Sequence, residues 1–121
     1  MNELELNQLV DTWIEATGAE TESNWWAIEQ VIDWDINRQG ELLWRFVMAA
    51  YKRDLSDKAV GSLAAGPLED LLGNHGPEYI ERVEELARKD PKFNFLLGGV
   101  WRNSMTDEVW QRVQAARLHV W

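Results

Sequence analysis

Cysteine is absent from this 121-residue chain. Disulfides, thiolate metal sites and a cysteine nucleophile are therefore excluded, and the composition fits a reducing compartment. The first residues also lack the basic start and the apolar stretch of a signal peptide. No apolar run approaches the roughly 20 residues that a membrane span requires. We expect a cytoplasmic protein with no membrane partner.

Positive charge is missing from the first third of the sequence. Residues 1–37 contain nine Asp and Glu residues and no Lys or Arg. Residues 38–90 contain ten acids against eight bases, and residues 91–121 contain two acids against four bases, so the first third alone accounts for the net charge of −9. Such a field repels nucleic acid and anionic membranes and speeds encounter with a cationic partner. The alternative is that the acidity only keeps the protein soluble.

Motifs that carry catalytic chemistry are also missing. The only two histidines, His75 and His119, lie in a connection rich in Gly and Pro and in a C-terminal tail that we expect to fray, and neither is placed to activate a nucleophile. No G-x-S-x-G, H-E-x-x-H, EF-hand loop or phosphate-binding glycine loop occurs. We therefore expect no enzyme activity, no metal and no cofactor. The alternative is an acidic metal site at Asp70, His75 and Glu78.

Helical spacing of apolar residues recurs along the chain, whereas the alternation typical of β-strands does not. With 45% hydrophobic and 27% charged residues, this is an ordinary globular sequence of single-domain length. At 14.1 kDa, about two thirds of the surface of the extended chain can be buried on folding. We predict one all-α domain over residues 1–121, a compact orthogonal or HEAT-like bundle of six to eight short helices.

Capping residues and apolar spacing indicate where the helices lie. The first is expected over about residues 3–17, and the second carries Trp25, Ile28 and Ile32 on its inward stripe. A third follows over about residues 37–52, with Leu43, Phe46, Val47 and Ala50 inward. Because Pro is accepted in a first helical turn, we predict further helix starts at the dipeptides Gly66-Pro67, Gly76-Pro77 and Asp90-Pro91. The segment Ser104-Met105-Thr106-Asp107 has the S/T-x-x-D form of another helix start.

Eight tryptophans stand out in so short a chain. Core packing accounts for those next to apolar helical positions, which are Trp13, Trp25, Trp34, Trp44 and Trp101. Trp26, Trp110 and Trp121 cover the edges of a small core in one interpretation. In the other, some tryptophans are exposed anchors, since Trp is enriched among interface hot spots and attracts Lys and Arg through cation–π contact.

Residues 63–110 resemble a family of small bacterial domains of unknown function. The resemblance lies in the segment AAGPLEDLL at residues 64–72 and in the pairs His75-Gly76, Tyr79-Ile80, Val83-Glu84, Asp90-Pro91, Leu96-Leu97, Val100-Trp101 and Asp107-Glu108, followed by Trp110. It implies an all-helical fold and a bacterial cytosolic setting, and it supplies no activity. We interpret most of these residues as structural. We expect Glu69 and Asp70 to complete a capping network at the Gly66-Pro67 turn or to pair with Arg102.

The acidic first third and its tryptophans together favour a protein-binding module. We predict an immunity-type inhibitor that occludes the active site of a cationic toxin or nuclease, without direct contact to nucleic acid. The alternative is an accessory scaffold or oligomerisation domain that self-associates through an apolar, Trp-rich face. The predicted contact residues are Glu22, Trp25, Trp26, Glu29, Asp33, Trp34 and Asp35.

Overall fold

The computed structural model describes residues 1–18 and 25–121, and every regular element in this part of the chain is helical. The prediction of an all-α domain is confirmed. None of the described helices is both long enough and apolar enough to cross a bilayer. The elements are α1 (Glu3–Gly18), α2 (Trp25–Ile36), α3 (Gly40–Tyr51), α4 (Asp57–Leu63), the π-helical η1 (Ala64–Leu68), α5 (Glu69–Lys89), α6 (Pro91–Leu97) and α7 (Asp107–Ala116).

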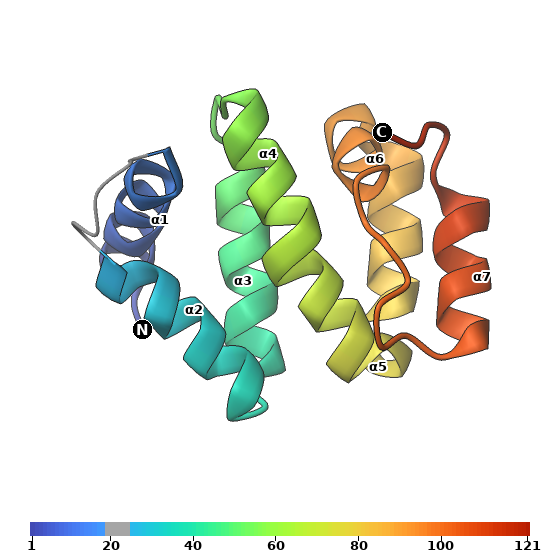
Figure 1. Ribbon diagram of the computed structural model, residues 1–121, viewed down its shortest axis with the longest axis horizontal. Helices are drawn as coiled ribbons and strands as arrows, with labels where there is room; N and C mark the ends of the chain where they lie inside the picture. Colours follow the sequence, from blue (N-terminus) through green and yellow to red (C-terminus); the bar gives the residue numbers. More distant parts are fainter. Residues whose placement is uncertain (19–24) are drawn as a thin grey trace.

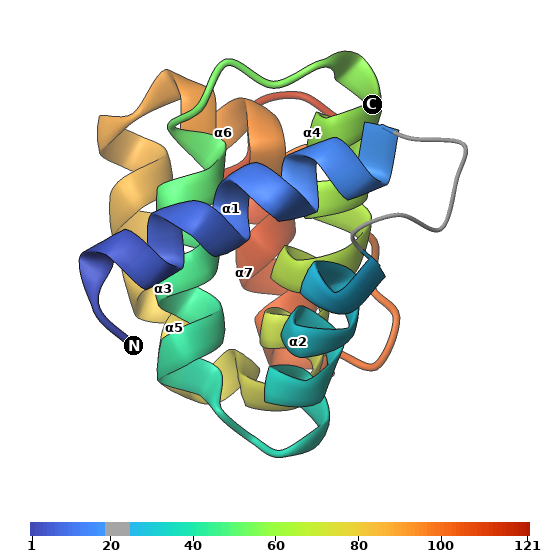
Figure 2. The ribbon, with the colours of Figure 1, turned by 90° about the vertical axis from the view of Figure 1, so that its left-hand side faces the viewer.

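The helices follow one another across the molecule in roughly chain order (Figure 1). Helices α1 and α2 form one end, and α7 lies at the other. Figure 2 looks onto the first end and shows α1 crossing in front of α3. Helix α3 is central, because it contacts α1, α2, α4, α5 and α6. Its predicted inward residues Leu43, Phe46, Val47 and Ala50 are all fully buried, which confirms the spacing argument for this helix.

One continuous helical rod joins α4, η1 and the first part of α5 (Figure 1). We expected a new helix to start at Gly66-Pro67, and this was wrong. Proline has no backbone N–H and its ring clashes with the carbonyl four residues earlier, so an α-helix that contains it must adjust. Here the turn widens into the π-helix η1, and the N–H of Glu69 reaches the carbonyl of Ala64, five residues back.

The second Pro dipeptide produces a reversal of the chain. His75, with φ −132° and ψ 18°, is not helical and divides α5 into two segments just before Gly76-Pro77. The second segment runs back beside α6 and α7 (Figure 1). Gly76 is needed at this corner for lack of space, because a Cβ there would lie 3.0 Å from both γ-methyl carbons of Val109 in α7.

The later helices begin at the residues that the sequence indicates. The Asp90 carboxylate accepts a hydrogen bond from the N–H of Lys92 (3.0 Å), with Pro91 at the first position of α6. Thr106 caps α7 by accepting from the N–H of Val109 (3.3 Å). Both caps satisfy backbone donors that a helix start leaves unpaired.

The C-terminal tail is held in place, contrary to the expectation that it frays. Asn94, 6% exposed, donates from Nδ2 to the carbonyl oxygens of Ala87 (3.1 Å) and Ala116 (3.0 Å). Its Oδ1 accepts from the N–H of Leu118 (2.9 Å). One buried amide therefore joins α5, α6, α7 and the tail. Further along, Trp121 stacks on Phe95 with the ring centroids 5.2 Å apart.

Candidate functional site

Helix α2 packs on the body through a different stripe from the predicted one. Its buried residues are Ala27, Val31 and Trp34, at the i, i+4, i+7 spacing of a helix face. Trp25 and Ile32, which we placed inward, are 50% and 49% exposed. The period alone could not decide between the two stripes, because this helix carries large apolar residues on both sides.

The outward side of α2 is unusually apolar for a surface. Four large side chains are about half exposed or more: Trp25 (50%), Trp26 (54%), Ile32 (49%) and Ile36 (70%). Glu29 and Asp33 are exposed between them. We call these six residues the α2 face. Apolar patches ringed by polar groups often mark sites of interaction.

The predicted contact residues divide into three groups. Trp25, Trp26, Glu29 and Asp33 lie together on the α2 face. Trp34 is 5% exposed and belongs to the core, so it cannot contribute to an exposed aromatic surface. Two others remain, Asp35 and Glu22. Asp35 is half-buried and accepts a hydrogen bond from Asn74 Nδ2 (2.7 Å), and Glu22 lies outside the described residues.

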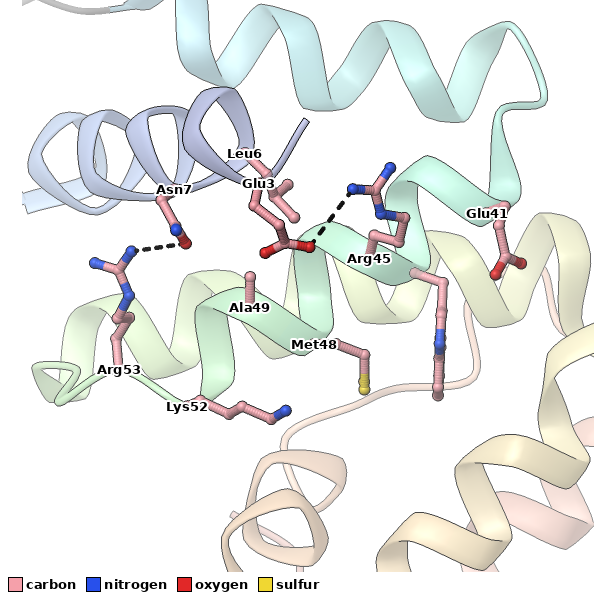
Figure 3. Close-up of a pocket in the computed structure, with 10 residues that line it drawn as sticks. Glu3, Leu6, Asn7, Glu41, Arg45, Met48, Ala49, Lys52 and Arg53 are labelled. Atoms are coloured by element: carbon pink, nitrogen blue, oxygen red, sulfur yellow. Dashed lines mark hydrogen bonds and ion pairs between the residues drawn. The ribbon is translucent and has the colours of Figure 1, made fainter. Parts of the chain in front are cut away.

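Part of the acidic surplus of the first third is neutralised by α3. Glu3 of α1 pairs with Arg45 (3.9 Å), and Asp11 forms an ion pair with Arg53. Glu3, Arg45 and Arg53 line a groove of about 500 Å³ between α1 and α3 (Figure 3). In contrast, Glu29 and Asp33 form no ion pair with any residue in the described ranges. The negative charges of Glu29 and Asp33 are therefore not neutralised by a base among the described residues.

Glu41, at the start of α3, also lines this groove, and its charge is paired with Arg82. Its carboxylate accepts from the Tyr79 hydroxyl (2.9 Å) and from Arg82 Nη1 (2.9 Å). These two hydrogen bonds lower the pKa of Glu41 below its usual value. The charges of the groove are therefore mostly paired, although Lys52 also lines it and forms no ion pair among the described residues.

A second and more enclosed pocket of about 330 Å³ lies between α1, α2 and η1. Its walls are mostly apolar, with Trp13 from α1, Ile28, Val31 and Ile32 from α2, and Leu43 from α3. We call it the Asp70 pocket, because Asp70 is its one titratable residue among the described ones.

Asp70 is an unusual carboxylate. Burial, together with the negative charges of Asp35 and Glu69, raises its pKa to about 6 from a usual value of 3.8. Among the described residues, none donates a hydrogen bond to its carboxyl group or forms an ion pair with it. The sequence singled out Asp70 without indicating this environment.

The neighbouring Glu69 faces the other way and has a structural role. Its carboxylate accepts from the backbone N–H of Trp101 (2.8 Å) and from Asn103 Nδ2 (3.3 Å). It therefore fastens the connection after α6 to the rod. The expected pairing with Arg102 is wrong, since Arg102 pairs instead with Asp107.

Comparison with known sequences places these features in a family. The sequence pattern of a family of unknown function (DUF6869) matches residues 15–120. The chain belongs to this family. No curated protein and no solved structure matches it. The match begins well before the segment in which we noted the resemblance, so the α2 face and, apart from Trp13, the Asp70 pocket lie within the matched residues.

The alternative metal site is not assembled. Asp70 lines its pocket, His75 is buried at the kink with Nε2 unbonded, and Glu78 is exposed. Within residues 1–18 and 25–121, no group of three or more His, Cys, Asp or Glu side chains is placed to hold a metal ion.

Two surfaces were missed in the sequence. The first is the part of the α2 face formed by Ile32 and Ile36. Their helical spacing to Trp25 and Glu29 places all four residues on one side of α2, so the sequence did contain a signal for it. At the other end, Trp101 is 63% exposed, and Phe95 and Trp121 are 52% and 42% exposed. Trp101 had been assigned to the core, and this was wrong.

Proposed function

We propose that this domain is a protein-binding module that docks the α2 face on a cationic surface of another protein. In its most specific form, it is an immunity-type inhibitor that covers the basic active site of a toxin or nuclease. The observation that carries the proposal is the α2 face itself, where four exposed apolar side chains surround Glu29 and Asp33.

Charge supports a basic partner. No Lys or Arg occurs in residues 1–37, and Arg45 and Arg53, which are close to this end, are paired with Glu3 and Asp11, although Arg38 is exposed just after α2. An active site that binds nucleic acid is itself positively charged and would be attracted to this end. Such attraction mainly raises the association rate and selects the partner.

Apolar area supports tight contact once the two proteins meet. Trp is among the residues most enriched at interface hot spots, and an exposed Trp loses contact with water on docking. Trp25 and Trp26 would supply this area on the α2 face, and Glu29 and Asp33, which lie among the apolar side chains, would supply polar contacts. The combination resembles the anatomy of a specific protein interface.

The experiment compares two variants with the same charge change. In the first, Glu29→Lys and Asp33→Lys reverse the α2 face; in the second, Glu78→Lys and Glu81→Lys reverse two exposed acids on the second segment of α5. A partner is isolated from the host with the unaltered protein and identified, and association rates are then measured at 50 and 500 mM salt.

We expect the first variant to lose binding by 100-fold or more and the second to bind within about threefold of the unaltered protein. We also expect the association rate of the unaltered protein to fall at least tenfold at the higher salt, because screening shortens the range of the attraction. Equal affinity of the two variants would contradict the proposal. Inhibition of a toxic or nuclease activity of the partner tests its more specific form.

Self-association through the α2 face is the alternative, favoured by its four exposed apolar residues. A symmetric dimer would bring the Glu29 and Asp33 of two copies close together, and like charges in one interface oppose pairing. Sedimentation analysis tests this directly. A homodimer that persists in high salt and is dissolved by Trp26→Ser and Ile36→Ser would favour the scaffold function over docking.

A further inference from the structure

The Asp70 pocket opens beside the α2 face, and the two share Ile32. A partner that covers the α2 face would therefore lie next to the pocket. The pocket volume of about 330 Å³ is within the range of ligand-binding pockets and exceeds what one side chain needs.

The rod leaves open space at Gly66, one of the residues that line the pocket. A Cβ built on Gly66 would meet no atom within 4 Å, although Gly66 belongs to the helical segment that lines the pocket. Pro67 fixes this segment as a π turn, and Asp70 follows one turn later. Such π turns are frequent at functional sites.

The polarity of the pocket selects a cation with an apolar body. Ile28, Val31 and Leu43 offer only apolar contact, whereas Asp70 offers a carboxylate that lacks a partner among the described residues. Asp35 and Glu69 add negative charge nearby, and this raises the pKa of Asp70. An anion would be repelled, and a neutral apolar group would leave the half-buried carboxylate unpaired.

We propose that the Asp70 pocket receives the side chain of a lysine or arginine of the bound partner, with the aliphatic stem against the apolar walls and the cationic head on the Asp70 carboxylate. Long basic side chains routinely bury their stems while their charged ends remain paired. This inference rests on the proposed function, since it names the group by which a basic partner is anchored next to the α2 face.

The first test needs no partner. N-acetyl-lysine N-methylamide and its norleucine counterpart, which lacks the ammonium group, are titrated separately against the isotope-labelled protein, and amide chemical shifts are followed by NMR. We expect the lysine probe to bind at least fivefold more tightly and to shift the amides of Ile32, Gly66 and Asp70. Equal binding of both probes, or shifts confined to other parts of the protein, would overturn the proposal.

Two variants make this test specific. Asp70→Asn retains the shape of the pocket and should reduce the preference for lysine over norleucine to about one. Asp54→Asn, an exposed carboxylate outside the pocket, makes the same change of charge and should keep the full preference. Gly66→Leu extends into the open space and should block both probes. A preference that survives Asp70→Asn would contradict the assignment of the carboxylate.

The second test separates this inference from the docking proposal. With an isolated partner, we expect Asp70→Asn to weaken binding at least tenfold and Asp54→Asn to have no effect. If reversal of the α2 face abolishes binding while Asp70→Asn leaves it unchanged, the pocket inference is wrong and the docking proposal stands. If Asp70→Asn weakens binding and reversal of the α2 face does not, the pocket is supported and the α2 face is not the docking site.

Discussion

Helix α2 and the C-terminal end of the molecule are held by different forces. At the N-terminal end, α2 is attached by the buried stripe Ala27, Val31 and Trp34, and its side-chain hydrogen bond to α5 runs from Asn74 to Asp35. At the C-terminal end, polar side chains join elements that are far apart in the sequence. They bind several backbone carbonyls and N–H groups that would otherwise remain unpaired.

This contrast separates polar side chains that stabilise the fold from polar side chains that face solvent. Asn94 and Glu69 use their polar atoms inside the C-terminal half, so they are not free to recognise a partner. Glu29 and Asp33 form no ion pair among the described residues and face solvent beside exposed apolar groups. Helix α2, which has fewer polar side-chain bonds to the rest of the protein, therefore has the more suitable surface for binding.

The largest expected effect concerns Trp34, the largest of the side chains that α2 buries in the core. Trp34→Ala removes a buried indole and should lower the free energy of unfolding by about 4 kcal/mol, as is typical for truncation of a buried aromatic residue. Trp26→Ala in the same helix is the matched control, and because its side chain is half exposed it should cost less than about 0.5 kcal/mol. Urea unfolding measures both. Similar losses would show that the two sides of α2 do not differ as the contrast requires.

The next effect tests the polar anchoring of the other end. Asn94→Ala should lower the free energy of unfolding by about 3 kcal/mol, since two carbonyls and one N–H lose a buried partner at about 1 kcal/mol each. Asn74→Ala removes an exposed side-chain hydrogen bond and serves as the control. Hydrogen exchange should show faster opening of the tail in the first variant alone. A loss below about 1 kcal/mol would contradict a structural role for this amide.

A third prediction concerns the corner between the segments of α5. Gly76→Ala places a methyl group against Val109 and should cost about 2 kcal/mol through overpacking. With Val109→Ala added, the total loss should be at least 1 kcal/mol smaller than the sum of the single losses, because the clash is then relieved. Gly61→Ala, where a Cβ meets nothing within 4 Å, should be neutral or stabilising. Additive losses in the double variant would exclude the clash as the cause.

Local chemistry made much of this fold predictable. Asp90-Pro91 and Thr106 mark helix starts through caps that need only neighbouring residues, and the apolar period of α3 identifies its buried face. Gly66-Pro67 was misread because a Pro within a continuous rod and a Pro at a helix start have the same sequence signal. The widening of the helix at η1 depends on its surroundings, which the local sequence does not contain.

The site was less predictable for a related reason. Which stripe of α2 is buried depends on the surface of α1, α3 and η1 that receives it, and the helix carries apolar residues on both sides. The outward acids Glu29 and Asp33 were correctly placed at the surface because charged residues are seldom buried. The pocket around Asp70 joins residues from five helices and η1, and no pattern within one segment indicates it.

The smallest of the four effects is a gain in stability, expected at Asp70. Its pKa of about 6 lies above the usual 3.8, so between these pH values the folded protein holds a proton that the unfolded chain has lost. Stability therefore falls as the pH rises from about 4 to about 6 and stays constant above that range with respect to this group. Because Asn cannot ionise, Asp70→Asn should stabilise the protein at pH 7 by about 1 kcal/mol, after allowance for the partial solvent exposure of Asp70.

The pH dependence of this gain distinguishes a charge effect from a change in packing. The difference between Asp70→Asn and the unaltered protein, measured by urea unfolding at pH 4, 5, 6 and 7, should rise from near zero to its full value across the interval. Asp54→Asn should show no such rise. A constant gain at every pH would contradict the buried charge. A gain that follows the predicted course would mean that the N-terminal end keeps an unpaired carboxylate at a cost in stability, as expected for a site that is completed by a cation from a partner.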